Sequence, residues 1–485
     1  MMFKKLVLKL FVFLFVLSVL IAPVGASGTD ISYNGNDNGN DLMLQAFHWN
    51  SANQGGTWYS MVNSMASTIG SYYTVVWMPP PNTAPSFAKQ GYLPEKWYDL
   101  NNYYGTQSDL KTVINSLHSQ NVKVLADIVI NHRNGMSQCS HGRYIYYSDP
   151  TMTPEIHLID GDYDTVNNGA EHTCAICANN GHTEGSWSYG GRTYYCDDYN
   201  AAPDLTHWSS QTRTAIKSWL SWLKNTTNAG FDGWRYDYIR GYAPQYLGEY
   251  NTSSSPYLSV GEFWKFEGEG LPSTARQALC DIVNQSGNKT MVFDFDLKRS
   301  MNNAFSGWAF NGSYLASIGE NGLNGLIGWW SQVAVTFVDN HDTGWSSGSA
   351  QNHWPLPTPC NGDLISVKAA YALVLTHPGI PCVYWADWRE RDSDLKTVIE
   401  TLIKIRRSNN VKRWSRVYVD RAESGLYAAY IGDANSEQVA IKIGNQGWTN
   451  YENWQPASNL GLNYNLQRYY NGGHAFCVYY KNVAN

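Results

Sequence analysis

Three carboxylic acids follow apolar segments that have the composition of buried strands. The first, Asp237, lies in the segment 230–244, two positions after Arg235, so both side chains project from the same face of a strand. A neighbouring guanidinium favours the ionised form of a carboxyl group. We therefore predict that Asp237 is a charged carboxylate able to attack a sugar carbon. A structural ion pair at a strand end is the alternative.

Glu262 and Asp342 are the other two acids, at the ends of the segments 257–263 and 333–338. Glu262 is flanked by Phe263 and Trp264, and such apolar neighbours raise a carboxyl pKa and keep the group protonated. Glycoside hydrolysis needs a carboxylate at the anomeric carbon and a carboxylic acid that protonates the leaving oxygen. The three acids together predict this chemistry, whereas any one of them is weak evidence.

The elements that position these acids alternate between strands and helices. Apolar runs predict strands at 42–49, 73–78, 122–130, 230–239, 257–263, 290–295, 333–338 and 380–385. Amphipathic or apolar segments predict helices at 107–120, 210–224, 369–375 and 394–407. The economical fold is a (β/α)₈ TIM barrel of the α/β class, with its active site at the carboxyl ends of the strands.

The strand and helix pattern changes in two places. The segment 133–203 is irregular and rich in Gly, Asn, Tyr and Cys, which predicts an inserted domain after the third strand. Beyond the barrel, short alternating segments such as 427–430 and 439–443 predict an antiparallel β domain. The predicted divisions are a signal peptide at 1–26, the barrel at 27–132 and 204–412, the insertion at 133–203 and the C-terminal β domain at 413–485.

The first residues have the pattern of a secretory signal peptide. Lys4 and Lys5 precede the apolar run 6–21, and Ala26 ends a small-residue stretch suited to cleavage. A membrane anchor is the alternative, which Lys9 disfavours. We predict a secreted, extracellular protein with no membrane association after cleavage. Removing these three lysines changes the formal net charge from −6 to −9, which argues against nucleic-acid binding.

Eight cysteines in a secreted chain predict disulfide bonds. Cys139, Cys174, Cys177 and Cys196 crowd the insertion. Half a zinc site at Cys174 and Cys177 is the alternative, but an oxidising compartment favours disulfides. The pairing is open.

Four motifs of the chain closely resemble those of the α-amylase family of glycoside hydrolases. They are ADIVINH (126–132), GWRYDYIRGYAP (233–244), VGEFW (260–264) and TFVDNHDTG (336–344). The motifs occur in the family's order, with the insertion in the family's place, and the resemblance extends over nearly all of the chain after residue 26.

The resemblance implies a retaining mechanism. Asp237 would be the nucleophile, Glu262 the general acid and base, and Asp342 would bind sugar hydroxyls in the distorted ring. Arg235 would orient Asp237. Further sugar contacts would come from His132, His341, Tyr92, Trp49 and Trp264. The alternatives are hydrogen-bonded core histidines and aromatic rings that pack on the barrel.

The resemblance also implies a structural Ca²⁺ between the barrel and the insertion. Calcium prefers carboxylate, amide and backbone oxygens. The implied ligands are Asn131, Asp197, Asn200, Asp204 and the Gly241 carbonyl, with solvated loop acids as the alternative. An acid at position 200 would bind more strongly than Asn200 does.

The predicted activity is endo-hydrolysis of α-1,4-glucosidic bonds in starch, glycogen and maltooligosaccharides by a monomer. The alternatives are an exo-acting maltooligosaccharide-forming enzyme, a transglycosylase of the same fold and a non-catalytic sugar-binding relative. Product-specific relatives have a loop that recognises chain ends, and the short segment 200–204 argues against such a loop here. Chloride-activated relatives have a basic residue near the eighth strand, where this chain has Cys382, so the resemblance does not imply chloride dependence. All three acids are present, which argues against the non-catalytic relative.

Overall fold

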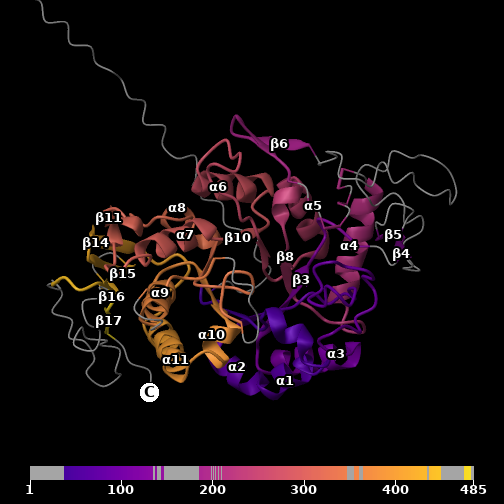
Figure 1. Cartoon of the computed structure of the whole chain (residues 1–485), viewed down its shortest axis with the longest axis horizontal. Helices are drawn as coiled ribbons and strands as arrows, with labels where there is room; N and C mark the ends of the chain where they lie inside the picture. Colours follow the sequence, from indigo (N-terminus) through magenta and orange to yellow (C-terminus); the bar gives the residue numbers. More distant parts are fainter. Residues whose placement is uncertain are drawn as a thin grey trace, which may run out of the picture.

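Eight parallel strands close into a barrel at the centre of the molecule (Figure 1). A computed structural model describes residues 38–134, 137–138, 144–146, 185–197, 199, 201–202, 204–205, 207–208, 210–346, 354–359, 364–433, 436–448 and 474–481. The barrel strands are β1 (Met43–Gln45), β2 (Val75–Met78), β3 (Lys123–Ile128), β8 (Gly233–Tyr236), β9 (Ser259–Gly261), β10 (Met291–Phe293), β12 (Ala334–Phe337) and β13 (Ile380–Tyr384). Neighbours pair in chain order and β13 closes on β1, so the predicted TIM barrel and its eight strands are confirmed.

Helices surround this barrel (Figure 1). They are α1 (Trp58–Ser64), α2 (Ala66–Tyr72), α3 (Gln107–Ser119), α4 (Ser210–Lys224), α5 (Pro244–Ser254), α6 (Ala275–Gln285), α7 (Phe295–Ala304), α8 (Ile327–Trp330), α9 (Ile365–Thr376), α10 (Trp385–Arg389) and α11 (Ser393–Ser408). The four predicted helices correspond to α3, α4, α9 and α11. In α3 the Thr106 hydroxyl caps the first turn and Asp109 completes a capping box, which fixes the predicted start.

The strand register brings the charged residues of the barrel together. Asp127 of β3 pairs with Arg235 of β8, and Arg235 pairs with Val260 of β9. Asp237 and Glu262 come directly after β8 and β9. Because parallel strands all point the same way, these residues meet at the carboxyl edge of the barrel.

Two hairpins are described between β3 and α4. They are β4 (Ser137–Gln138) with β5 (Tyr144–Tyr146), and β6 (Ser186–Tyr189) with β7 (Arg192–Tyr195). The second hairpin docks on α6, because the Arg192 guanidinium donates to both oxygens of the buried Asp281, at 2.6 and 2.7 Å. Most of the predicted insertion lies outside the described residues.

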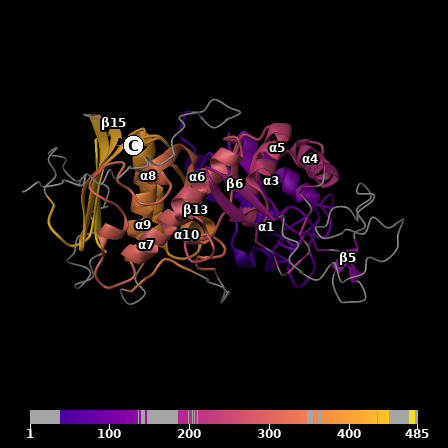
Figure 2. The same cartoon turned by 90° about the horizontal axis from the view of Figure 1, so that it is seen from above.

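An antiparallel sheet forms the C-terminal domain, as predicted. Its strands are β14 (Val417–Glu423), β15 (Leu426–Asp433), β16 (Ser436–Ile443) and β17 (Phe476–Tyr480). The sheet and β5 lie at opposite ends of the molecule (Figure 2). A fifth strand, β11 (Gly319–Glu320), joins β14 from within the barrel region and was not predicted.

Several predictions concern residues outside the described part of the chain. They include the signal peptide, Asn200, and Cys139, Cys174, Cys177 and Cys360. Within the described part, Cys280 and Cys382 are buried free thiols, so not every cysteine is in a disulfide. Among the helices that the structure describes, none has the length and apolar composition of a membrane span.

Candidate active site

Arg235 is the centre of the acid cluster. Its guanidinium is fully buried and lies 4.8 Å from the centre of the Trp77 ring. Nη1 lies 2.9 Å from Oδ1 of Asp127 and 2.6 Å from Oδ1 of Asp237, and Nη2 lies 2.9 Å from Oε1 of Glu262. One cation therefore holds three carboxyl groups, including the Asp237 partner that the sequence spacing predicted.

Asp237 and Glu262 also contact each other. Their side chains share a hydrogen bond, in which Glu262 is the donor when it carries the proton. Burial raises the pKa of Glu262 to about 7, as its apolar neighbours predicted. Burial also raises the pKa of Asp237 to about 6, because desolvation outweighs the pull of Arg235. The expected effect of Arg235 on Asp237 is present, and with a pKa of about 6 the group is still mostly ionised at neutral pH.

Asp127 is a member of the cluster that sequence reasoning missed. Its Oδ2 accepts from the Trp77 indole at 3.1 Å and from the Tyr92 hydroxyl at 2.8 Å. Burial raises its pKa to about 6. An acid inside the otherwise apolar segment 122–130 was the signal that could have identified it. Asp127 fixes Tyr92 and Arg235 at once.

Three aromatic rings lie nearly parallel beside the acids. The Tyr92 and His341 rings are 5.2 Å apart with 9° between their planes, and Trp49 lies 6.2 Å from Tyr92 and 6.1 Å from His341. The three rings form an aromatic platform in which Trp49 and Tyr92 are partly exposed and His341 is buried. Such a surface suits the apolar face of a sugar ring.

Asp342 lies beside His341 at this platform. The Gln45 side-chain amide donates to Nδ1 of His341 at 2.8 Å, so the ring proton is on Nε2, which lies 3.2 Å from Oδ2 of Asp342. Burial lowers the pKa of His341 well below its usual value, and the imidazole is neutral. Burial and the nearby Glu262 raise the pKa of Asp342 well above its usual value.

His132 is buried, and its ring contacts differ from the predicted sugar contact. Its Nε2 donates to the Tyr92 carbonyl at 2.7 Å, and Nδ1 accepts from the Asn131 amide at 3.2 Å. Burial lowers its pKa to about 4. Both ring nitrogens thus bind protein atoms, and His132 holds the Tyr92 loop in place.

Tyr199 covers the exposed side of this arrangement and was not predicted. Its ring stacks on His132 with 3.7 Å between centroids and 10° between planes, and meets Tyr238 edge-on at 5.2 Å. The charges of Asp237 and Asp342 add to the effect of burial in raising its pKa. Through Tyr199 the insertion therefore contacts His132 and Tyr238, next to the acid cluster.

Trp264 packs against two other aromatic rings. Its ring stacks on Phe295 at 5.2 Å and on Trp354 at 5.9 Å, and its carbonyl accepts from Arg240 at 2.6 Å. These contacts favour the alternative, packing at the barrel edge.

A second corner, next to the acids, is lined by oxygens. The Asn131 amide donates to Oδ1 of Asp204 at 3.1 Å, whereas its buried Oδ1 has no hydrogen-bond partner among the described residues. A Cβ atom at Gly241 would lie 1.9 Å from that oxygen and 3.0 Å from the Asp197 carbonyl oxygen. Only a glycine fits here, and the surrounding oxygens are of the kind that Ca²⁺ prefers.

The Asp197 side chain departs from its predicted place as a ligand. Its carboxylate lies 2.5 Å from Arg240 Nε and 2.7 Å from Lys265 Nζ. It therefore ties the insertion to the segments after β8 and β9. Only its main-chain oxygen faces the Asn131 corner.

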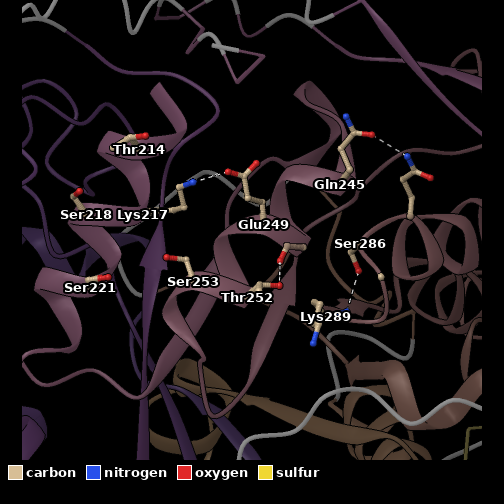
Figure 3. Close-up of a pocket in the computed structure, with 13 residues that line it drawn as sticks. Thr214, Lys217, Ser218, Ser221, Gln245, Glu249, Thr252, Ser253, Ser286 and Lys289 are labelled. Carbon is tan, nitrogen blue, oxygen red and sulfur yellow. Dashed lines mark hydrogen bonds and ion pairs between the residues drawn. The ribbon is translucent and has the colours of Figure 1, made fainter. Parts of the chain in front are cut away.

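A polar cavity of about 990 Å³ lies elsewhere, between α4, α5 and α6 (Figure 3). Its side chains largely satisfy one another, as in the Lys217–Glu249 ion pair at 2.6 Å and the Gln285–Gln245 hydrogen bond at 3.1 Å. It has no facing pair of carboxyl groups, so the acid chemistry belongs to the barrel edge.

Known proteins match this fold and these motifs. A family model described as alpha amylase, catalytic domain, matches residues 66–259. The chain is 34% identical over 417 residues to the probable alpha-amylase 2 of Arabidopsis thaliana, covering 84% of this chain and 89% of that protein. The chain belongs to the α-amylase family. This α-amylase-family chain is therefore a glycoside hydrolase, as its motifs predicted.

A second relative and a solved structure are also similar to this α-amylase-family chain. It is 31% identical over 467 residues to a glucan 1,4-alpha-maltotetraohydrolase of Stutzerimonas stutzeri, covering 89% of this chain and 74% of that protein. The crystal structure of an Anoxybacillus alpha-amylase covers 93% of this chain and all of its own, with a TM-score of 0.59 at 15% identity. This last likeness supports the fold.

Proposed function

We propose that the protein is a secreted endo-acting α-amylase that hydrolyses α-1,4-glucosidic bonds of starch and glycogen with retention. The observation that carries this proposal is the side-chain hydrogen bond between Glu262 and Asp237, both of which Arg235 holds. It supplies an acid and a nucleophile at the same edge of a barrel, which a retaining glycosidase requires.

The reaction has two steps. In the first, Asp237 attacks the anomeric carbon while Glu262 gives its proton to the glycosidic oxygen; the carbon–oxygen bond breaks and a glycosyl ester forms on Asp237. In the second, Glu262 takes a proton from water, whose oxygen displaces Asp237. The two inversions give retention. Arg235 keeps contact with both groups throughout and stabilises the charge on Asp237 as it leaves.

The neighbouring side chains fit a glucose unit between them. Trp49 and Tyr92, the partly exposed rings of the platform, offer a face for the sugar ring. Asp342, beside His341, presents carboxyl oxygens that can bind sugar hydroxyls. Starch, glycogen and maltooligosaccharides present many such units in series.

A second candidate is an exo-acting enzyme that releases a maltooligosaccharide of fixed length. The match to two maltotetraohydrolases, at 31% and 32% identity over more than two thirds of each, favours it. We favour endo action because the segment 200–204 is short. In a time course, endo action predicts a rapid fall in viscosity before much reducing sugar appears, whereas exo action gives one product from the start.

We propose that Ca²⁺ binds the corner of Asn131, Asp204 and Gly241, with the Asp197 main-chain oxygen as a further ligand. The unpartnered Asn131 oxygen and the space that only glycine leaves support this site. Bound Ca²⁺ supplies a charge that joins the insertion to the barrel. Asn200 lies outside the described residues and stays a predicted ligand.

The test is starch hydrolysis by the wild type beside Glu262→Gln. The substitution keeps the shape of the side chain and removes its proton donor and acceptor role. We expect kcat to fall by about 10³-fold or more, with a normal melting temperature. Configuration at the anomeric carbon, followed by NMR, should be retained. A wild type that leaves starch and maltooligosaccharides intact contradicts the proposal.

A further inference from the structure

Tyr238 follows Asp237 directly and has a left-handed backbone, with φ 45° and ψ 49°. Among the described residues, six that are not glycine have positive φ: four are Asn, one is Ser255, and Tyr238 is the one bulky residue. This conformation is disfavoured for a bulky side chain and persists only where its surroundings hold it.

The left-handed turn directs two successive N–H groups to one residue. The Tyr238 N–H donates to Oε2 of Glu262 at 3.2 Å, and the Ile239 N–H donates to the Glu262 carbonyl at 3.1 Å. In an extended strand, successive N–H groups point to opposite sides. Both can reach Glu262 only because the chain turns at Tyr238.

The same segment holds Glu262 from further positions. The Glu262 N–H donates to the Tyr236 carbonyl at 3.0 Å, and Oε1 lies 2.9 Å from Nη2 of Arg235. Both main-chain groups and both carboxyl oxygens of Glu262 are thus bound by residues 235–239. The acid belongs to β9 in sequence, but its position is set by the end of β8.

We propose that Tyr238 is a positioning residue whose left-handed backbone fixes the carboxyl group of Glu262 in its proton-donating place. This inference rests on the proposed function of Glu262 as the general acid. It assigns the role to the backbone, since both N–H contacts to Glu262 come from the main chain, whereas the Tyr238 ring meets Tyr199 and His132 edge-on and lies under Arg240.

The amide contact also has a direction in pH. An N–H donor favours the ionised carboxylate, so its loss should raise the pKa of Glu262 and move the alkaline limb of activity to higher pH. The other charged or titratable groups that face Glu262 stay in place in the variants below. They are Arg235, Asp237, Asp127, Asp342 and Tyr199.

The experiment compares Tyr238→Asn with Tyr238→Val. Both remove the ring, but Asn adopts the left-handed conformation readily and the β-branched Val does not. With a defined maltooligosaccharide, we expect kcat of the Val variant to be at least about tenfold below that of the Asn variant, with a smaller change in KM. The alkaline limb of the Val variant should lie higher by about half a pH unit.

Ser255→Val is the matched control. Ser255 has φ 44° and precedes β9, at the opposite edge of the barrel from the acids. The Ser255→Val substitution should lower the melting temperature, whereas kcat and the alkaline limb of activity should stay unchanged. If Tyr238→Val does not fold, Tyr238→Ala and Tyr238→Gly make the same comparison, because Gly adopts positive φ freely and Ala does not.

Equal kcat and equal limbs in the Asn and Val variants would overturn the inference. If both lose the same activity, the ring rather than the backbone matters. In either case starch hydrolysis by the wild type and its loss in Glu262→Gln would still support the proposed function. A wild type without activity on α-glucans would instead remove the proposed function itself.

Discussion

Two neighbouring corners of the barrel edge differ in how completely their polar groups are paired. At the ends of β8 and β9, Arg235 binds Asp127, Asp237 and Glu262, and backbone N–H groups hold Glu262 as well. At the end of β3, the Asn131 amide nitrogen is paired, whereas its buried oxygen has no partner among the described residues.

Buried polar atoms almost always have partners, so the Asn131 oxygen should have one beyond the described residues, and the Ca²⁺ proposed above would supply it beside Gly241. In the acid corner, Arg235 and the carboxyl groups that it holds are already in place, so they need not reorganise during the reaction. The Asn131 corner should instead respond to what is added to the solution.

The largest effect should follow from breaking the paired corner. Arg235→Lys keeps the positive charge but loses the fork that reaches three carboxyl groups. We expect kcat on soluble starch to fall by about 100-fold or more, and the free energy of unfolding to fall by roughly 3 kcal/mol. Arg240→Lys, which changes an ion pair outside the acid cluster, is the control and should cost far less. A nearly normal kcat in Arg235→Lys would show that the fork is dispensable.

The Asn131 corner should be destabilised when a side chain is added at Gly241. In Gly241→Ala the new Cβ would lie 1.9 Å from Asn131 Oδ1, so we expect the free energy of unfolding to fall by about 1–3 kcal/mol. We also expect that Ca²⁺ no longer raises the melting temperature. Calorimetry in calcium and in chelator measures both. Gly307→Ala, which meets only ordinary contacts, is the control. A wild type that ignores chelator and contains no metal by elemental analysis would remove the calcium proposal.

The pH dependence of kcat/KM tests the roles assigned to Asp237 and Glu262. Activity needs Asp237 ionised and Glu262 protonated, so kcat/KM should fall as pH drops through about 6 and as it rises through about 7. Because the two groups share a proton, these limbs belong to the pair. Outside them the rate should change about tenfold per pH unit. An alkaline limb that is absent up to pH 9 would contradict the assignment of Glu262 as the acid.

The smallest effect concerns Tyr199, which lies where the two corners meet. Tyr199→Ala removes the stack on His132, and a stacked pair contributes about 0.5–1.5 kcal/mol, so KM should rise roughly two- to tenfold. Tyr199→Phe keeps the stack and should stay close to the wild type. Tyr195→Ala, at a ring 68% exposed on β7, is the control. Equal KM values for Ala and Phe at position 199 would mean that the stack does not position His132.

The barrel could be predicted because its signals are local. Apolar runs and turn residues mark each of the eight strands, and the helices α3, α4 and α11 have one buried face. Elements without such signals were missed. The strand β11 has only two residues and exists because β14 pairs with it. Helices α1, α2, α5 to α8 and α10 were likewise not predicted.

The sequence by itself determined which acids stand at strand ends and that Arg235 shares a face with Asp237, because side-chain alternation is a property of one strand. How far the pKa of each acid is shifted depends on the folded barrel. Burial raised the pKa of Asp237 against the pull of Arg235, and burial depends on the whole barrel. The fold likewise decided that Asp127 and Tyr238 hold the site, since their partners Tyr92 and Glu262 come from other segments of the chain. Contacts between distant segments follow from packing, which no local pattern encodes.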